Sequence, residues 1–216
     1  MSFEAQYMNI LVFLDSFNPE NIIQYGGLTL LLIIIFAETG VFFGFFLPGD
    51  SLLFIAGLLS DTEYLDTNIA LLITLLIIAA VSGSMVGYLT GRWAGVYLAN
   101  KKDSLFFKKK YLDLTQAFYQ KHGMMAFILG RFLPVVRTFV TILAGMVKID
   151  FPKFLIFNFL GASIWILTMV LSGHFLGQAF PQITTYLEII VVGMILVSAI
   201  PVVITWLKNR NLLAKD

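Results

Sequence analysis

Two apolar stretches of this chain carry charged side chains beside a proline, and this combination restricts the fold more than any other feature. Residues 38–50 begin and end with an acid and contain Pro48, whereas residues 131–137 begin and end with an arginine and contain Pro134. A charge at the middle of a bilayer costs at least about 2.5–3.5 kcal/mol, so such residues mark ion or substrate paths. Broken backbone at that depth is tolerated only inside protein or against a water-filled cavity. The two stretches therefore predict the core of a transporter.

The composition supports a membrane location. Of the 216 residues, 59% are hydrophobic and only 12% are charged, and the mean hydropathy is +0.89. Soluble domains average about 25% charged residues. We therefore expect one all-α polytopic membrane domain over residues 1–216. The chain has no cysteine and two histidines, so we expect no disulfide, no metal site and no cofactor. We also expect no nucleic-acid partner.

The distribution of charge along the chain sets the expected topology. All 14 lysines and arginines lie between Arg92 and Lys215, and the charged side chains of residues 1–68 are all acidic. Basic residues in short loops stay in the cytoplasm. We therefore expect the N-terminus and the 61–68 loop outside, and the basic 92–121 segment and the C-terminus in the cytoplasm.

Hydrophobic runs and helix-end signals predict the order of elements. They are an interfacial helix over residues 3–16, a hairpin with arms of about 20–37 and 50–59, a spanning helix over 69–97, an amphipathic helix over 104–121, a broken segment over 124–147, and spanning helices over about 150–177 and 187–207. Each hairpin arm is shorter than the ~20 apolar residues that span a bilayer, so we expect a re-entrant hairpin. The lysines of the amphipathic helix are expected to contact anionic lipids at the inner surface.

Two short patterns recur at the same spacing. Residues 44–48 resemble residues 130–134, and residues 87–91 resemble residues 173–177. In both cases the second segment lies 86 positions after the first (from residue 44 to residue 130, for example). The expected units are repeat 1 (about 20–98), an amphipathic linker (99–123), repeat 2 (about 124–178) and a C-terminal transmembrane helix (187–207). Each repeat holds one hairpin and one spanning helix, so the second must be inverted, as in many secondary transporters. Chance similarity in a Gly/Phe-rich chain is the alternative.

The four charges of the two stretches suit a phosphate group. If a helix starts at Pro134, Arg137 lies in its first turn, where free backbone N–H groups favour an anion. A guanidinium also grips phosphate with two hydrogen bonds. We therefore expect Arg131 and Arg137 to bind a lipid phosphate. The alternative is that they only neutralise Glu38 and Asp50, because buried charges are usually paired. Both alternatives hold if the ion pairs form in the empty site and open when the substrate binds.

The two acids are expected to have different roles. Asp50 follows Pro48 and Gly49, where the first hairpin breaks, and it falls in an opening helical turn, where capping is the simplest role. Glu38 follows a run of leucine and isoleucine and has no capping role. Burial favours its neutral form, whereas a neighbouring arginine favours its ionised form. This competition makes Glu38 the better candidate for proton coupling.

Several of these patterns resemble the signatures of the DedA family, whose domain is also called the SNARE-associated or VTT domain. The segments that carry the resemblance are residues 38–57, 87–92, 130–145 and 158–165, and it spans about residues 25–178. One departure is Ser84, because the family often has Asp after the glycine at this point. No role for an acid can be carried over to Ser84.

The resemblance implies movement of phosphate-bearing lipids between the leaflets of a bacterial inner membrane, driven by the proton motive force, with undecaprenyl phosphate as the leading substrate. The family's functional charges fall on Glu38, Asp50, Arg131 and Arg137. Alternatives are a passive scramblase, for example of phosphatidylethanolamine, and an assembly or homeostasis factor. An intramembrane lipid phosphatase is disfavoured because the four charges lack a nucleophile, so we expect no enzyme.

The tryptophans, one histidine and the regularly spaced glycines have simpler expected roles. The tryptophans Trp93, Trp165 and Trp206 are expected to anchor the chain at the membrane interface or to pack. His174 is expected to be a packed or hydrogen-bonded filler. Glycines spaced four residues apart serve contacts within the chain or between copies, which leaves a homo-oligomer open.

Overall fold

The computed structural model describes residues 19–41, 44, 47–62, 65–99, 123 and 125–180. These residues form helices and two isolated β-bridges, without a strand among them. The elements are α2 (Pro19–Gly40), α3 (Gly49–Leu58), α4 (Ile69–Ala99), α6 (Met125–Leu129), the short 3₁₀ helix η2 (Gly130–Phe132), α7 (Pro134–Met146) and α8 (Phe151–Ala179). This agrees with the all-α prediction. The helices expected over residues 3–16, 104–121 and 187–207 lie outside the described residues.

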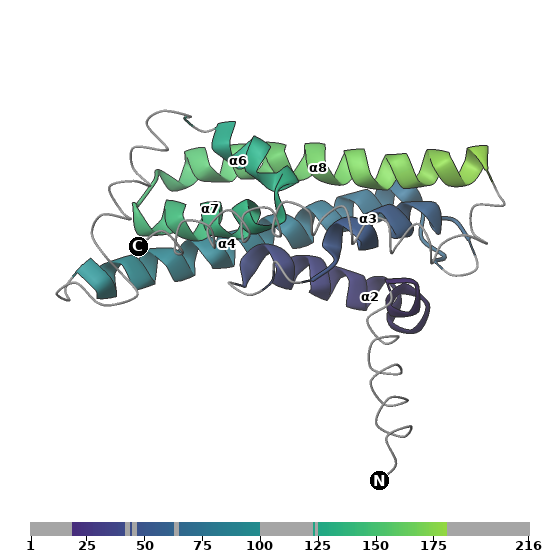
Figure 1. Cartoon of the computed structure of the whole chain (residues 1–216), viewed down its shortest axis with the longest axis horizontal. Helices are drawn as coiled ribbons and strands as arrows, with labels where there is room; N and C mark the ends of the chain where they lie inside the picture. The colour runs from purple at the N-terminus through teal and green to yellow at the C-terminus, as the bar shows by residue number, and fades with distance from the viewer. Residues whose placement is uncertain are drawn as a thin grey trace, which may run out of the picture.

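Two long antiparallel helices, α4 and α8, form the frame of the molecule (Figure 1). They have 31 and 29 residues, and at ~1.5 Å per residue each is longer than the ~30 Å hydrocarbon core of a bilayer. Both contain an apolar stretch long enough to cross a membrane, Ile69–Gly95 and Phe151–Ala179. Asp150 caps α8, since its side chain accepts from the Lys153 N–H at 3.5 Å. Both helices begin where the sequence predicts.

Helices α2 and α3 are the two arms of the first predicted hairpin. Gly27 has φ 56° and ψ −157°, a conformation that glycine adopts readily, and it kinks α2. The apolar part of α2 is therefore only Gly26–Gly40. Backbone hydrogen bonds such as Leu47 N–H to Gly44 O (2.9 Å) turn the chain toward α3, which starts directly after Pro48.

The second broken segment has the same general plan. Helix α6 leads into η2, and α7 starts at Pro134 as predicted, with Leu133 at the N-cap in an extended conformation. Helices α3 and α7 both start near the middle of the molecule and run toward opposite ends (Figure 1). The two breaks therefore face the centre of the two long helices.

Glycines bring each of these arms against the long helix of the other sequence repeat. A Cβ atom added at Gly57 of α3 or Gly173 of α8 would overlap a backbone carbonyl of the opposite helix. The same is true of Gly91 of α4 and Gly145 of α7. Only glycine permits such close backbone contact. Helix α3 is thus held against α8, and α7 against α4.

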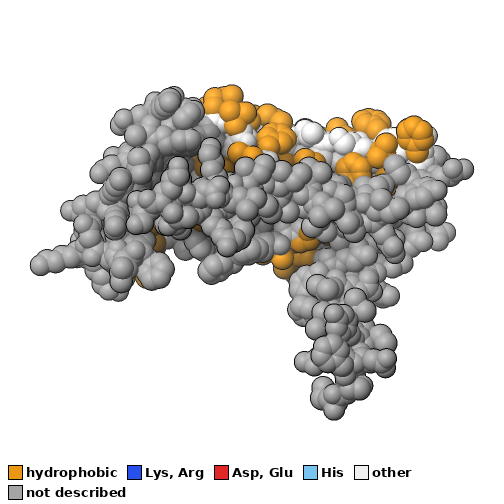
Figure 2. Space-filling view, viewed as in Figure 1, with side chains coloured by type: hydrophobic (Ala, Val, Ile, Leu, Met, Phe, Trp, Pro, Cys, Tyr) orange, Lys and Arg blue, Asp and Glu red, His pale blue; other side chains and the backbone are white. Residues whose placement is uncertain are grey.

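The exposed face of α8 is apolar, as expected of a helix in contact with lipid. Large hydrophobic side chains of α8 are exposed, namely Ile156, Phe159, Leu160, Ile164, Leu167 and Phe175. Figure 2 shows hydrophobic side chains gathered along α6 and α8. By contrast, Glu38, Arg131 and Arg137 are buried. A soluble protein has the opposite distribution, so the surface and the interior both indicate an integral membrane protein.

Candidate substrate site in the charged core

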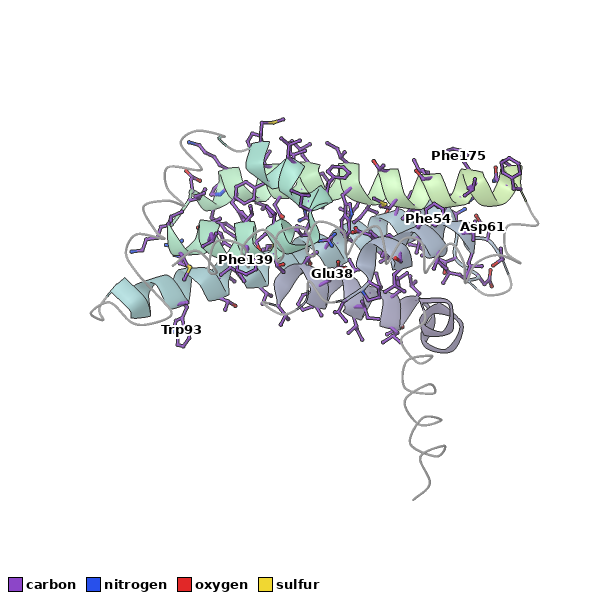
Figure 3. All side chains as sticks on the ribbon, viewed as in Figure 1. Glu38, Phe54, Asp61, Trp93, Phe139 and Phe175 are labelled. Carbon is purple, nitrogen blue, oxygen red and sulfur yellow. The ribbon has the colours of Figure 1, made fainter. Side chains whose placement is uncertain are left out.

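The four predicted core charges lie on four different elements that meet at the two breaks. Glu38 is in the last turn of α2 and Asp50 in the first turn of α3, whereas Arg131 is in η2 and Arg137 in the first turn of α7. In Figure 3, Glu38 lies near the middle of the molecule, far from the ends of α4 and α8. The site therefore exists only when both broken segments are folded against each other.

Arg137 binds both acids of the first hairpin. Its Nη2 atom donates to Oε1 of Glu38, and its Nη1 atom donates to Oδ1 of Asp50 at 3.2 Å. Glu38 and Arg137 are sealed from the surface, with 1% and 2% exposure, while the Asp50 side chain is 22% exposed. The pairing joins the two broken segments, and Asp50 lies closest to the exterior.

Trp165 completes this cluster from α8. Its ring nitrogen Nε1 donates to Asp50 Oδ1 at 2.8 Å, and the guanidinium carbon of Arg137 lies 4.3 Å from the ring centroid. Trp165 is fully buried, which agrees with the packing role, of the two roles expected for the tryptophans. Its N–H has a buried acceptor, which removes the usual reason for an indole to stay at the interface. Trp93 is 73% exposed near the end of α4, and Trp206 lies outside the described residues (Figure 3).

Arg131 has a different environment, although it is also buried. Its Nη2 atom donates to Ser84 Oγ at 2.9 Å and to Asn158 Oδ1. Both partners are neutral. The sequence left open that the two arginines neutralise the two acids; in the structure both acids bind Arg137, and the hydrogen bonds of Arg131 go to uncharged groups.

The residues at the breaks position these charges. Pro48 occupies the N-cap position of α3, which has no side-chain cap, and Asp50 Oδ1 accepts from Arg137 and Trp165 instead. Capping alone therefore does not describe the contacts of Asp50. A Cβ atom at Gly49 would overlap the Glu38 carboxylate, so a glycine is needed for this carboxylate to reach Arg137.

Three contact residues, Ser84, Asn158 and Trp165, were not assigned to the site from the sequence. Asn158 and Trp165 are seven positions apart on α8, which places them two turns apart on one helix face. This spacing, together with their polar atoms in an apolar helix, was the available signal. His174 fits its predicted role, since its two ring nitrogens lie 2.9 Å from Ser60 Oγ and from Gln178 Nε2.

The unused hydrogen-bonding atoms of the core indicate what it can bind. Within the described residues, the buried side-chain atoms without a partner include Glu38 Oε2, Arg131 Nη1, Arg137 Nε and Asn158 Nδ2. The last three can only donate. Across the same residues, no group of three or more His, Cys, Asp or Glu could hold a metal ion. The core is therefore suited to a ligand rich in acceptor oxygens.

Exposed apolar side chains around largely buried ion pairs define an integral membrane protein with its charged groups in the interior. Residues 47–175 match the VTT domain, and the chain belongs to the DedA family. Protein DedA of Escherichia coli K12 is 38% identical over 210 residues, which are 96% of this chain and 95% of that protein.

Two further relatives support the same assignment. An uncharacterised membrane protein of Mycobacterium leprae is 40% identical over 186 residues, covering 86% of this chain and 82% of the relative. Inner membrane protein YqjA of Escherichia coli K12 is 32% identical over 148 residues, covering 68% and 66%. No solved structure matches the chain. The relatives' names place this chain in a membrane and, through YqjA, favour the inner membrane.

Proposed function

We propose that this protein moves a phosphate-bearing lipid between the leaflets of the bacterial inner membrane, with undecaprenyl phosphate as the first candidate. The observation that carries the proposal is the Arg137 guanidinium, which is held between Glu38 and Asp50 in a sealed core. A lipid phosphate needs such a polar interior to cross the hydrocarbon layer. A guanidinium can exchange a carboxylate for a phosphate because both accept two parallel hydrogen bonds.

Proton coupling follows from the charge balance of the core. Two arginines and two carboxylates sum to zero, so an anion that enters the site leaves an excess negative charge. Uptake of a proton by Glu38 would balance a phosphate monoanion, or halve the excess left by a dianion, and would release Arg137 for the phosphate. The carboxylate of Glu38 has one oxygen on Arg137 and one without a partner among the described residues. Glu38 is therefore our candidate for the proton carrier, and protons and a lipid phosphate are the proposed partners.

The membrane arrangement belongs to the same proposal. Each segment with a break is taken as re-entrant, and repeat 2 as inverted relative to repeat 1. The reciprocal contacts, α3 on α8 and α7 on α4, support this arrangement because an inverted repeat exchanges the two pairs. We place the N-terminus outside and the C-terminus in the cytoplasm, and the basic residues 92–121 at the anionic inner surface.

Other functions differ in measurable ways. A passive scramblase would move phosphatidylethanolamine as fast as a lipid phosphate and without a pH gradient. An assembly or homeostasis factor would move neither lipid. An intramembrane phosphatase would release inorganic phosphate. We propose that the protein is not an enzyme. A hydroxyl nucleophile needs a base, whereas Ser84, the hydroxyl that contacts Arg131, donates its proton to the Ala80 carbonyl at 2.9 Å.

The test is lipid flux in vesicles that contain the purified full-length protein. We expect a fluorescent polyprenyl phosphate to move faster than labelled phosphatidylethanolamine, and to move faster still with a pH gradient. Arg131→Ala and Arg137→Ala should each remove most of this flux. Glu38→Gln should leave a folded protein whose flux no longer responds to pH. Equal flux of both lipids without a gradient would contradict the proposed function. Unchanged pH dependence of flux in Glu38→Gln would contradict the role of Glu38 as the proton carrier.

A further inference from the structure

The two arginines of the core are not equivalent, although the sequence presents them as a pair. Arg137 has two carboxylate partners and a tryptophan ring at 4.3 Å. Arg131 is 3% exposed and its hydrogen bonds go to a hydroxyl and an amide. A buried charge without an opposite charge beside it costs several kcal/mol. Arg131 is thus the position where a bound anion would stabilise the protein most.

The partners of Arg131 have fixed donor and acceptor roles. Ser84 Oγ donates its only proton to the Ala80 carbonyl at 2.9 Å, so it must accept from Arg131. A guanidinium has no acceptor, so the amide of Asn158 must present Oδ1 to it. This orientation leaves Asn158 Nδ2 as a donor next to the guanidinium. Neither Nδ2 nor Arg131 Nη1 has a partner among the described residues.

The two residues that carry these unused donors hydrogen-bond each other through Arg131 Nη2 and Asn158 Oδ1. Asn158 is 1% exposed, so water does not reach Nδ2 from the surface. A buried donor without an acceptor is unfavourable, and two such donors on a hydrogen-bonded pair of residues favour a ligand with several acceptor oxygens. Phosphate provides these oxygens and the negative charge that Arg131 lacks.

We propose that Arg131 and Asn158 form a dedicated phosphate subsite, and that the neutral Ser84 sets its affinity by leaving the guanidinium without a competing acid. This inference rests on the proposed function and assigns roles within that site. Arg137, in contrast, is paired with both acids in the closed state, and it becomes available to the phosphate only when Glu38 takes up a proton. The ligand chemistry is a phosphomonoester, which either a lipid headgroup or free phosphate can supply.

Trp165 gives a direct signal for this subsite. The Arg131 guanidinium carbon lies 6.0 Å from its ring centroid, so an anion that binds Arg131 changes the surroundings of the indole. The chain has three tryptophans, and replacing Trp93 and Trp206 with phenylalanine leaves Trp165 as the single emitter. The full chain with these two changes, in lipid nanodiscs, is titrated with geranyl phosphate, inorganic phosphate or geraniol.

Position 84 provides a matched pair of variants. Ser84→Ala removes the hydroxyl that accepts from Arg131 without adding charge, and we expect its affinity for geranyl phosphate to fall less than that of Ser84→Asp. Ser84→Asp places a carboxylate on Arg131, and we expect about 10- to 100-fold weaker binding, the usual effect of losing a charge-assisted hydrogen bond. Asn158→Asp keeps the shape but replaces the Nδ2 donor with a carboxylate oxygen beside Arg131, and both changes should weaken binding to a similar extent. A cooperative melting transition without ligand shows that each variant folds, and geranyl phosphate should raise the melting temperature of the parent more than those of the two Asp variants.

The outcomes divide clearly. Binding of geranyl phosphate and inorganic phosphate but not geraniol supports a site for the free anion, and binding of geranyl phosphate alone supports a lipid headgroup site. The inference is overturned if Ser84→Asp and Asn158→Asp bind like the parent, or if Ser84→Ala weakens binding as much as Ser84→Asp. It is also overturned if the parent moves polyprenyl phosphate in vesicles but binds no phosphate probe. Absence of both flux and binding would instead refute the proposed function.

Discussion

The Arg137 cluster makes a quantitative prediction about the stability of the protein. Arg137→Met keeps the apolar stem but leaves Glu38 and Asp50 without their guanidinium. Removing one partner of a buried ion pair costs about 3–5 kcal/mol, because the other charge stays buried. Glu38→Gln keeps the shape of the side chain and leaves Arg137 bound to Asp50, so we expect a smaller loss of about 1–3 kcal/mol.

The double variant tests the reasoning most directly. In Glu38→Gln/Arg137→Met the sealed carboxylate is gone, and the remaining acid, Asp50, is 22% exposed and bonded to Trp165. We therefore expect the double variant to be no less stable than Arg137→Met alone, although simple addition would make it worse. The coupling should be about 1–3 kcal/mol, the range found for groups in one network.

The assay is reversible unfolding of the purified protein in mixed detergent micelles, followed by circular dichroism. Arg92→Met is the matched control because Arg92 is exposed on α4, and its free energy of unfolding should change by less than about 0.5 kcal/mol. Losses that add within about 0.5 kcal/mol in the double variant would refute the assigned pairing.

Two further substitutions test other contacts of the core. Gly49→Ala puts a methyl group where the Glu38 carboxylate lies, so we expect the unfolding free energy to fall by about 1–3 kcal/mol and the pH-dependent flux to be lost. Gly130→Ala is the control, because its Cβ atom would meet only side chains, the nearest at 3.2 Å. Equal behaviour of the two variants would contradict the placement of Glu38. Trp165→Phe keeps a ring beside Arg137 but removes the hydrogen bond from the indole N–H to Asp50, which should lower the free energy of unfolding by about 1–3 kcal/mol. A decrease below about 0.5 kcal/mol would mean that this hydrogen bond does not stabilise the core.

Local signals in the sequence were enough for the elements and for the position of the charges. Proline and asparagine or aspartate at helix starts predicted the beginnings of α3, α7 and α8 to within a residue, because these signals act within one turn. The length of the apolar runs predicted α4 and α8. Charges flanking the two breaks were also sound evidence for a shared site.

The sequence alone could not predict which acid pairs with which arginine inside the site. Which acid meets which arginine depends on contacts between residues 87 and 99 positions apart, and no local pattern encodes them. Neutral residues were missed for another reason. A serine in the middle of a helix usually bonds a preceding carbonyl, as Ser84 does with Ala80, so its second contact leaves no trace in the sequence. For Trp165 the sequence allows either packing or an interface position, and only the position of Asp50 explains its burial and its hydrogen bond.

The glycine contacts described above have a mechanical consequence. Because α3 and α8 touch backbone to backbone, as do α7 and α4, neither arm can slide along its neighbour without a clash. The parts that travel as rigid bodies are then not the two halves of the polypeptide but two interlocked blocks, each built from both halves. Cutting the chain between the repeats should therefore yield fragments that fold only together, and alternating exposure of the core would come from one block tilting against the other.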